Sequence, residues 1–152
     1  MIATQLKNAL TGAVVGAIGG PIIGGLSGFL ILSAVWLIQG LIQQWPAEEL
    51  RASLAWASVF GVLVAPLSVS AGVIVGGVIG AFGRWFGSLV NAGSFGGLVG
   101  SIIGIIAGLS LFGRGGGELS PVIVAFVAVT ITGVAVALAV KKLQWRLSRS
   151  QP

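Results

Sequence analysis

The sequence predicts an all-α integral membrane protein with four transmembrane helices, and three observations predict it. Only 7% of the 152 residues are charged, whereas soluble domains carry about a quarter. The mean hydropathy is +1.09, and 56% of the residues are apolar. The eleven charged side chains also leave four long uncharged stretches, at residues 8–47, 52–83, 85–113 and 119–140. We therefore expect one membrane domain over residues 1–152.

Each uncharged stretch is long enough to cross a bilayer. A spanning helix needs roughly 20 apolar residues to cross about 30 Å of hydrocarbon. The apolar cores predict spans at about residues 12–35, 56–79, 95–112 and 122–140, followed by a basic cytoplasmic tail at 141–152. The length of the first stretch leaves two alternatives: one kinked span, or a re-entrant hairpin with its tip at Gly19–Pro21 plus a span. Asn91, before the third core, is expected to cap that helix.

The charges predict that both termini are cytoplasmic, because cytoplasmic flanks of membrane helices are enriched in Lys and Arg. In this topology the inner side receives Lys7, Arg84, Lys141, Lys142, Arg146 and Arg149. The outer side receives Arg51 and Arg114 together with all three acids, Glu48, Glu49 and Glu118. The tryptophans agree with this topology, with Trp36, Trp45 and Trp56 near the outer interface and Trp85 and Trp145 near the inner one.

Eleven of the 26 glycines recur at intervals of four in three of the predicted helices. These helix-packing glycines are Gly12, Gly16, Gly20 and Gly24, then Gly72, Gly76 and Gly80, then Gly96, Gly100, Gly104 and Gly108. A four-residue step places them on one helical face, where a missing side chain lets another backbone approach closely. We expect GxxxG packing within this chain or between identical subunits. The alternatives are a docking surface for a helix of a different membrane protein and a close-approach site for a flat apolar ligand.

Two of the glycine ladders resemble each other. Residues 11–24, TGAVVGAIGGPIIG, are echoed by residues 95–108, FGGLVGSIIGIIAG, and both would run from inside to outside. This echo suggests a parallel duplication of a two-helix hairpin. The fourth helix carries a softer ladder of mostly small residues, Ala125, Val129, Gly133 and Ala137. The pattern over about residues 10–140 is similar to the glycine-zipper class of small membrane proteins and, more loosely, to the mitochondrial inner-membrane protein-import channel family.

Two prolines lie inside predicted spans. Pro21 and Pro66 leave the carbonyls of Ala17 and Val62 without a helical donor, and we expect each to bend its helix. Most Ser and Thr residues in the spans are expected to return a hydrogen bond to the backbone of their own helix.

The residues that usually carry chemistry are scarce, so we expect no enzyme, no metal site and no cofactor. The sequence has no His, Cys or Tyr. No charged residue lies deep in a predicted span, where proton relays and ion-coupled transporters usually hold one. Glu48 and Glu49 are adjacent and cannot oppose each other across a cleft. Residues 113–117, GRGGG, lack the Lys-Ser/Thr of a phosphate-binding loop and are expected to form an outer turn.

The C-terminal end is basic. Lys141, Lys142, Arg146 and Arg149 surround Trp145, and we expect these residues to contact anionic lipid headgroups, with an acidic cytoplasmic partner as the alternative. Nucleic acid is not an expected partner, because the isoelectric point of about 11.5 reflects the small number of acids.

These observations predict a function within the bilayer. We expect a non-enzymatic polytopic protein that acts as a structural or accessory subunit, in a homo-oligomer or with other membrane-protein subunits. The alternatives are an oligomeric pore or membrane-permeabilising protein of the holin or effector type, and a carrier of a small solute or lipid. The membrane is expected to be a bacterial plasma membrane or a thylakoid.

Overall fold

Four α-helices make up most of the computed structural model, which describes residues 2–112 and 120–149. They are α1 (Ile2–Gln43), α2 (Ala47–Phe82), α3 (Leu89–Phe112) and α4 (Ser120–Arg149). Each is long and apolar enough to cross a membrane, so the all-helical class and the four candidate spans are confirmed. The expected outer turn at 113–117, with Arg114, and Glu118 beyond it lie outside the described residues, as does the side chain of Arg149.

The helices are longer than the apolar cores predicted. The 42 residues of α1 are about 63 Å long at 1.5 Å per residue. Because α1 continues without a break through Gly19–Pro21, residues 8–43 form one helix and not a re-entrant hairpin. Residues 141–149, predicted as a tail, are the last turns of α4. Apolar composition marks only the part of a helix at hydrocarbon depth, and polar residues extend it into the interface.

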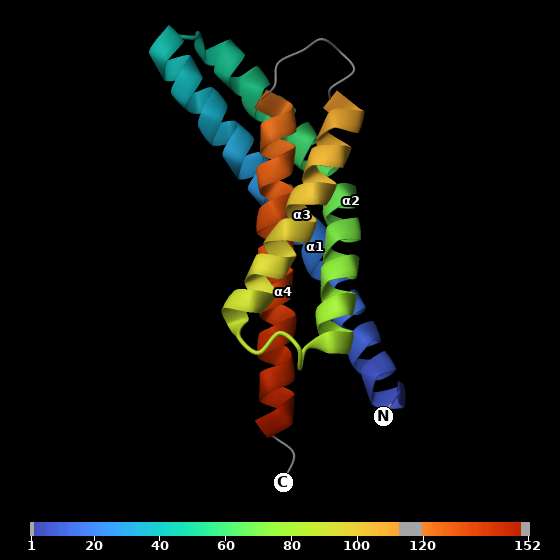
Figure 1. Ribbon diagram of the computed structural model, residues 1–152. Coiled ribbons are helices and arrows are strands. Elements are labelled where there is room, and N and C mark those ends of the chain that lie inside the picture. The colour runs from blue at the N-terminus through green and yellow to red at the C-terminus, as the bar shows by residue number, and fades with distance from the viewer. Residues whose placement is uncertain (1, 113–119, 150–152) are drawn as a thin grey trace.

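The helices form two antiparallel hairpins, α1–α2 and α3–α4 (Figure 1). α4 packs against both helices of the first hairpin, and the N and C termini lie at the same end of the molecule (Figure 1). Towards the α1–α2 turn, the first hairpin leans away from α3 and α4 (Figure 1). α2 slants in its first half and runs alongside α4 in its second, and Pro66 lies near the middle of its sequence.

Mostly small and branched side chains, together with Phe60, fill the two buried clusters between the hairpins. The cluster nearer the α1–α2 turn includes Leu32, Phe60, Val64 and Val129, and the other includes Val75, Ile79 and Val136. On the opposite face of α1, a stripe of apolar residues at four-residue spacing is at least 56% exposed: Leu6, Leu10, Val14, Ile18, Ile22, Leu26 and Leu30. This face suits hydrocarbon as its solvent.

Ser88, and not Asn91, caps α3. The Oγ atom of Ser88 accepts a hydrogen bond from the backbone N–H of Asn91 at 3.2 Å. Asn91 is therefore the third residue of a helix that begins at Leu89, and its backbone is capped by the serine before it.

The turn between α1 and α2 is a short helix-ending motif. Gln44 adopts a positive φ of 53°, and the N–H of Trp45 donates to the carbonyl of Gly40 at 2.9 Å. This pairing is the six-to-one bond of a Schellman motif, with Gln44 at the position that glycine usually takes. Pro46 then prevents the helix from continuing and directly precedes α2.

Replacing Gln44 with Gly is expected to stabilise the protein by up to about 1 kcal/mol, because glycine adopts a positive φ without a steric penalty. Gln39→Gly is the matched control. Gln39 is exposed inside α1, where glycine costs about 1 kcal/mol relative to good helix formers. Unfolding in mixed detergent micelles measures both variants. Equal destabilisation by the two substitutions would contradict the strain assigned to Gln44.

Candidate functional site

α1 and α2 approach each other through glycines. A Cβ atom added to Gly12 would overlap the carbonyl oxygen of Gly76, and one added to Gly76 would overlap the carbonyl of Gly12. Gly16 and Gly72 have the same reciprocal relation. The remaining ladder positions of this hairpin also face the partner helix: Gly20 the carbonyl of Ser68, Gly24 its side chain, and Gly80 the carbonyl of Asn8. The two backbones are therefore in direct contact over about three turns.

α3 and α4 approach in the same way at one end and less closely at the other. Gly96 and Gly133 are reciprocal, because a Cβ on either would overlap the carbonyl of the other. A Cβ on Gly100 would lie 2.6 Å from the carbonyl oxygen of Val129, whereas one on Gly108 would lie 3.2 Å from that of Val122. Gly104 lies between them and faces the backbone of Phe126. All eleven predicted packing glycines thus face another helix of the same chain.

Hydroxyl groups occupy the centre of the bundle. Ser68 of α2 and Thr132 of α4 are fully buried and lie beside Gly24 of α1. Each donates to its own helix, Ser68 to the carbonyl of Val64 at 3.1 Å and Thr132 to that of Ala128 at 2.9 Å. This is the expected behaviour of Ser and Thr in apolar helices, where the backbone carbonyl is the nearest acceptor.

The hydroxyl groups of Ser101 and Ser33 depart from this pattern, whereas Thr130 donates to the carbonyl of Phe126 in its own helix at 2.7 Å. The hydroxyls of Ser101 and Thr130 lie 3.1 Å apart and form a hydrogen bond between α3 and α4. The Oγ atom of Ser33 is buried with no hydrogen-bond partner among the described residues. A direct hydrogen bond between helices, such as that between Ser101 and Thr130, typically contributes less than about 2 kcal/mol in a membrane.

The carboxyl end of α2 is tied to α4. The Nζ atom of Lys141 donates to the carbonyl of Gly83, which caps α2. The Nε2 atom of Gln144 donates to the carbonyls of Ile79 at 3.1 Å and Gly80 at 2.8 Å. The last carbonyls of a helix have no intrahelical donor and carry partial negative charge. The amide and ammonium groups of α4 supply those donors and the balancing charge.

Gly83 makes this junction possible. A Cβ atom at position 83 would overlap the Oε1 atom of Gln144. The sequence interpretation assigned Lys141 to headgroup contact and missed both Gly83 and Gln144. No local signal identifies them, because the bonded residues are 58 to 65 positions apart.

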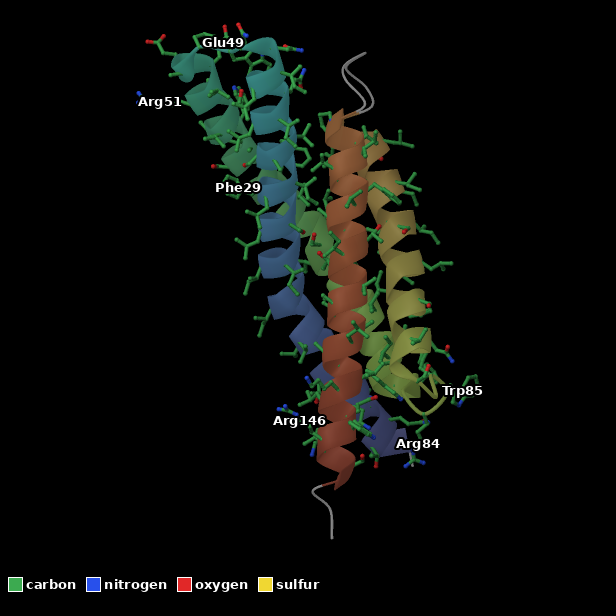
Figure 2. All side chains as sticks on the ribbon, turned by 90° about the vertical axis from the view of Figure 1, so that its left-hand side faces the viewer. Phe29, Glu49, Arg51, Arg84, Trp85 and Arg146 are labelled. Atoms are coloured by element: carbon green, nitrogen blue, oxygen red, sulfur yellow. The ribbon has the colours of Figure 1, made fainter. Side chains whose placement is uncertain are left out.

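A groove of about 530 Å³, lined by both polar and apolar side chains, lies beside this junction. Its walls are the first turns of α1, the end of α2 with the residues after it, and the last turns of α4. Side chains that line it include Gln5, Asn8, Arg84, Lys141, Gln144 and Trp85. Arg84 and Trp85 lie on one side of the molecule, and Arg146 lies on the other (Figure 2). The predicted headgroup residues are thus divided, since Lys141 and Trp145 line the groove whereas Lys142 and Arg146 do not.

The two prolines that were predicted to kink their helices lie in α1 and α2. Pro21 and Pro66 lie inside continuous helices, and how sharply each bends its helix stays a prediction.

In the described part of the chain, no group of three or more His, Cys, Asp or Glu residues lies together in a way that could hold a metal ion.

Replacing Gly16 with Ala is expected to destabilise the protein by about 1 to 3 kcal/mol, because the added methyl group overlaps the backbone of Gly72. Gly19→Ala is the matched control, since a Cβ at Gly19 meets only side-chain atoms at 3.9 Å or more. Its expected effect is neutral or slightly stabilising. Unfolding in detergent micelles measures both, and equal effects would refute backbone contact at Gly16.

Replacing Gly83 with Ala is expected to cost about 1 to 2 kcal/mol, because Gln144 must move and give up its bonds to α2. Gly87→Ala is the control in the same loop, where a Cβ would meet no atom within 4 Å. The measurement is again the free energy of unfolding in detergent. A stable Gly83→Ala protein would show that the junction contributes little.

Comparisons of the chain with protein-family models, with curated protein sequences and with solved structures found no match.

Proposed function

We propose that this chain is a non-enzymatic integral membrane protein that acts as a structural or accessory subunit. The observation that carries the proposal is that the α1–α2 hairpin leans away from α3 and α4 towards its turn (Figure 1) and exposes apolar side chains there. Exposed apolar residues of α1 beyond Leu32, its last residue in the buried cluster with α4, include Ile38, Leu41 and Ile42. A transmembrane helix of another subunit, or of a second copy, would cover this surface.

Glycine-ladder packing is the proposed basis of the bundle's stability. Lipid is as apolar as the helices, so association in a membrane depends on close packing and on weak Cα–H···O contacts. The reciprocal contacts Gly12–Gly76, Gly16–Gly72 and Gly96–Gly133 support this reading. Because all the ladder glycines face helices of their own chain, a partner would bind on other surfaces.

The register of the two hairpins supports the proposed duplication. In each hairpin the first ladder glycine, Gly12 or Gly96, pairs with a glycine of the following helix. The next ladder glycine, Gly16 or Gly100, then faces the residue four positions earlier in that helix, Gly72 or Val129. Two hairpins derived from one ancestral unit would share the glycine–glycine pairing, whereas the four-residue step is common to antiparallel helix pairs.

The distribution of charge supports a topology with both termini cytoplasmic. Arg84 and Arg146 lie at the end that holds the termini, and Glu49 and Arg51 lie at the opposite end (Figure 2). By the positive-inside rule the first of these ends faces the cytoplasm. This asymmetry suits a bacterial plasma membrane or a thylakoid.

Photo-crosslinking in native membranes tests the accessory role. A photoreactive phenylalanine is placed at Ile38, on the free part of the hairpin, or at Ile18, on the outer stripe of α1. The two positions are matched, because both are isoleucines of α1 and are 59% and 62% exposed. We expect a discrete protein adduct at position 38 and only lipid adducts at position 18. Two differently tagged copies of the chain distinguish a self-adduct from a different subunit.

Two results would contradict the proposal. One is the absence of a protein adduct at position 38 under conditions where lipid is labelled at both positions. The other is release of a trapped dye from liposomes by the purified protein, which would favour the oligomeric pore or permeabilising protein instead.

A further inference from the structure

The groove at the end that holds the termini has the features of a binding site. It measures about 530 Å³ and is bounded by three helices. Ligand pockets in proteins typically have volumes of about 300 to 1,000 Å³. Because residues from the beginning, middle and end of the chain line it, the groove exists only when the two hairpins are assembled.

The wall between α2 and α4 is held in place by hydrogen bonds. Both amide hydrogens of Gln144 are directed to carbonyls of α2, so this side chain fixes the groove's shape. Lys141 gives one of its three N–H donors to the carbonyl of Gly83. Within residues 2–112 and 120–149 only this hydrogen bond of the ammonium group is observed, so its other two donors can reach a ligand.

The groove is positively charged. Its charged lining residues are Arg84 and Lys141. The only acids in the sequence are Glu48, Glu49 and Glu118, and Glu49 lies at the far end of the molecule (Figure 2). Arg84 is exposed and presents a planar fork of donors that matches a phosphate. The charge of the groove therefore favours an anion.

The rim of the groove is amphipathic. Trp85 is 85% exposed and Trp145 is 58% exposed, and both line the groove. Tryptophan is enriched at the depth of lipid headgroups. Phe82 and Leu147, which also line it, are exposed apolar residues that suit an acyl chain. The amides of Gln5 and Asn8 on α1 provide uncharged donors and acceptors opposite the basic side.

We propose that this groove binds the phosphate group of an anionic glycerophospholipid. Arg84 and Lys141 contact the phosphate oxygens, the amides of α1 contact the glycerol or the polar headgroup, and the acyl chains lie along the outside of the bundle. The bound lipid then joins α1 to the α2–α4 junction. This assignment is independent of the accessory role, because it involves the opposite end of the hairpin.

Native mass spectrometry of the full chain in a mild detergent tests the proposal. The probes are dioleoyl phosphatidylglycerol, dioleoyl phosphatidylcholine and inorganic phosphate. We expect one phosphatidylglycerol to bind in preference to phosphatidylcholine, and Arg84→Gln to weaken that binding at least roughly fivefold. Arg146→Gln is the matched control, because it removes the same charge at the same end without altering the groove. Its expected effect is less than about twofold.

Arg84→Lys keeps the positive charge but removes the planar guanidinium with its fork of donors. We therefore expect an intermediate affinity for phosphatidylglycerol. Unchanged helicity and unfolding temperature before lipid is added identify variants that retain the fold. Equal weakening by Arg84→Gln and Arg146→Gln would overturn the site and show diffuse surface attraction. Absence of a preference for phosphatidylglycerol would overturn it as well. Inorganic phosphate that competes at concentrations equal to those of the lipid would overturn the lipid as ligand.

Discussion

Direct contact between the backbones of α1 and α2 is the constraint on which the rest of the structure depends. At Gly12–Gly76 and Gly16–Gly72 no side chain separates the two helices. Because these two helices are so close, α4 packs against both of them. Thr132 of α4 lies beside Ser68 and Gly24 at the centre of the bundle. The lack of side chains at the ladder glycines of α1 and α2 therefore determines where α4 packs.

The second hairpin is joined to the first by polar groups at one end. Gln144 and Lys141 supply donors to the carbonyls of Ile79, Gly80 and Gly83 at the end of α2. In hydrocarbon, a carbonyl without a hydrogen-bond donor costs free energy. Near the interface, the donors of Gln144 and Lys141 compete with water for the same carbonyls. The junction thus combines helix capping with attachment of one hairpin to the other, and it shapes the groove beside it.

The sequence predicts the number of helices well, because an uncharged stretch of more than 20 residues has few alternatives to a spanning helix. It underestimates their length, since Lys7, Glu49 and Lys141 are polar but lie inside helices that extend past the apolar cores. It identifies the ladder glycines by their spacing but does not say which helix each ladder faces. Gln144 and Gly83 are not predictable in this way, because their roles arise only when segments distant in sequence meet.

The four-residue spacing of the ladders also bears on sliding between helices. If α1 moved by one turn along α2, Gly16 would meet Gly76 and Gly20 would meet Gly72, so glycine would again face glycine. The ladders alone therefore do not select one alignment. Selection comes from the three residues that connect α1 to α2 and from Phe29, whose Cβ would lie only 3.1 Å from a Cβ added to Gly61. Sliding by a single turn is a known mode of motion between packed helices, and in this chain the short connection prevents it.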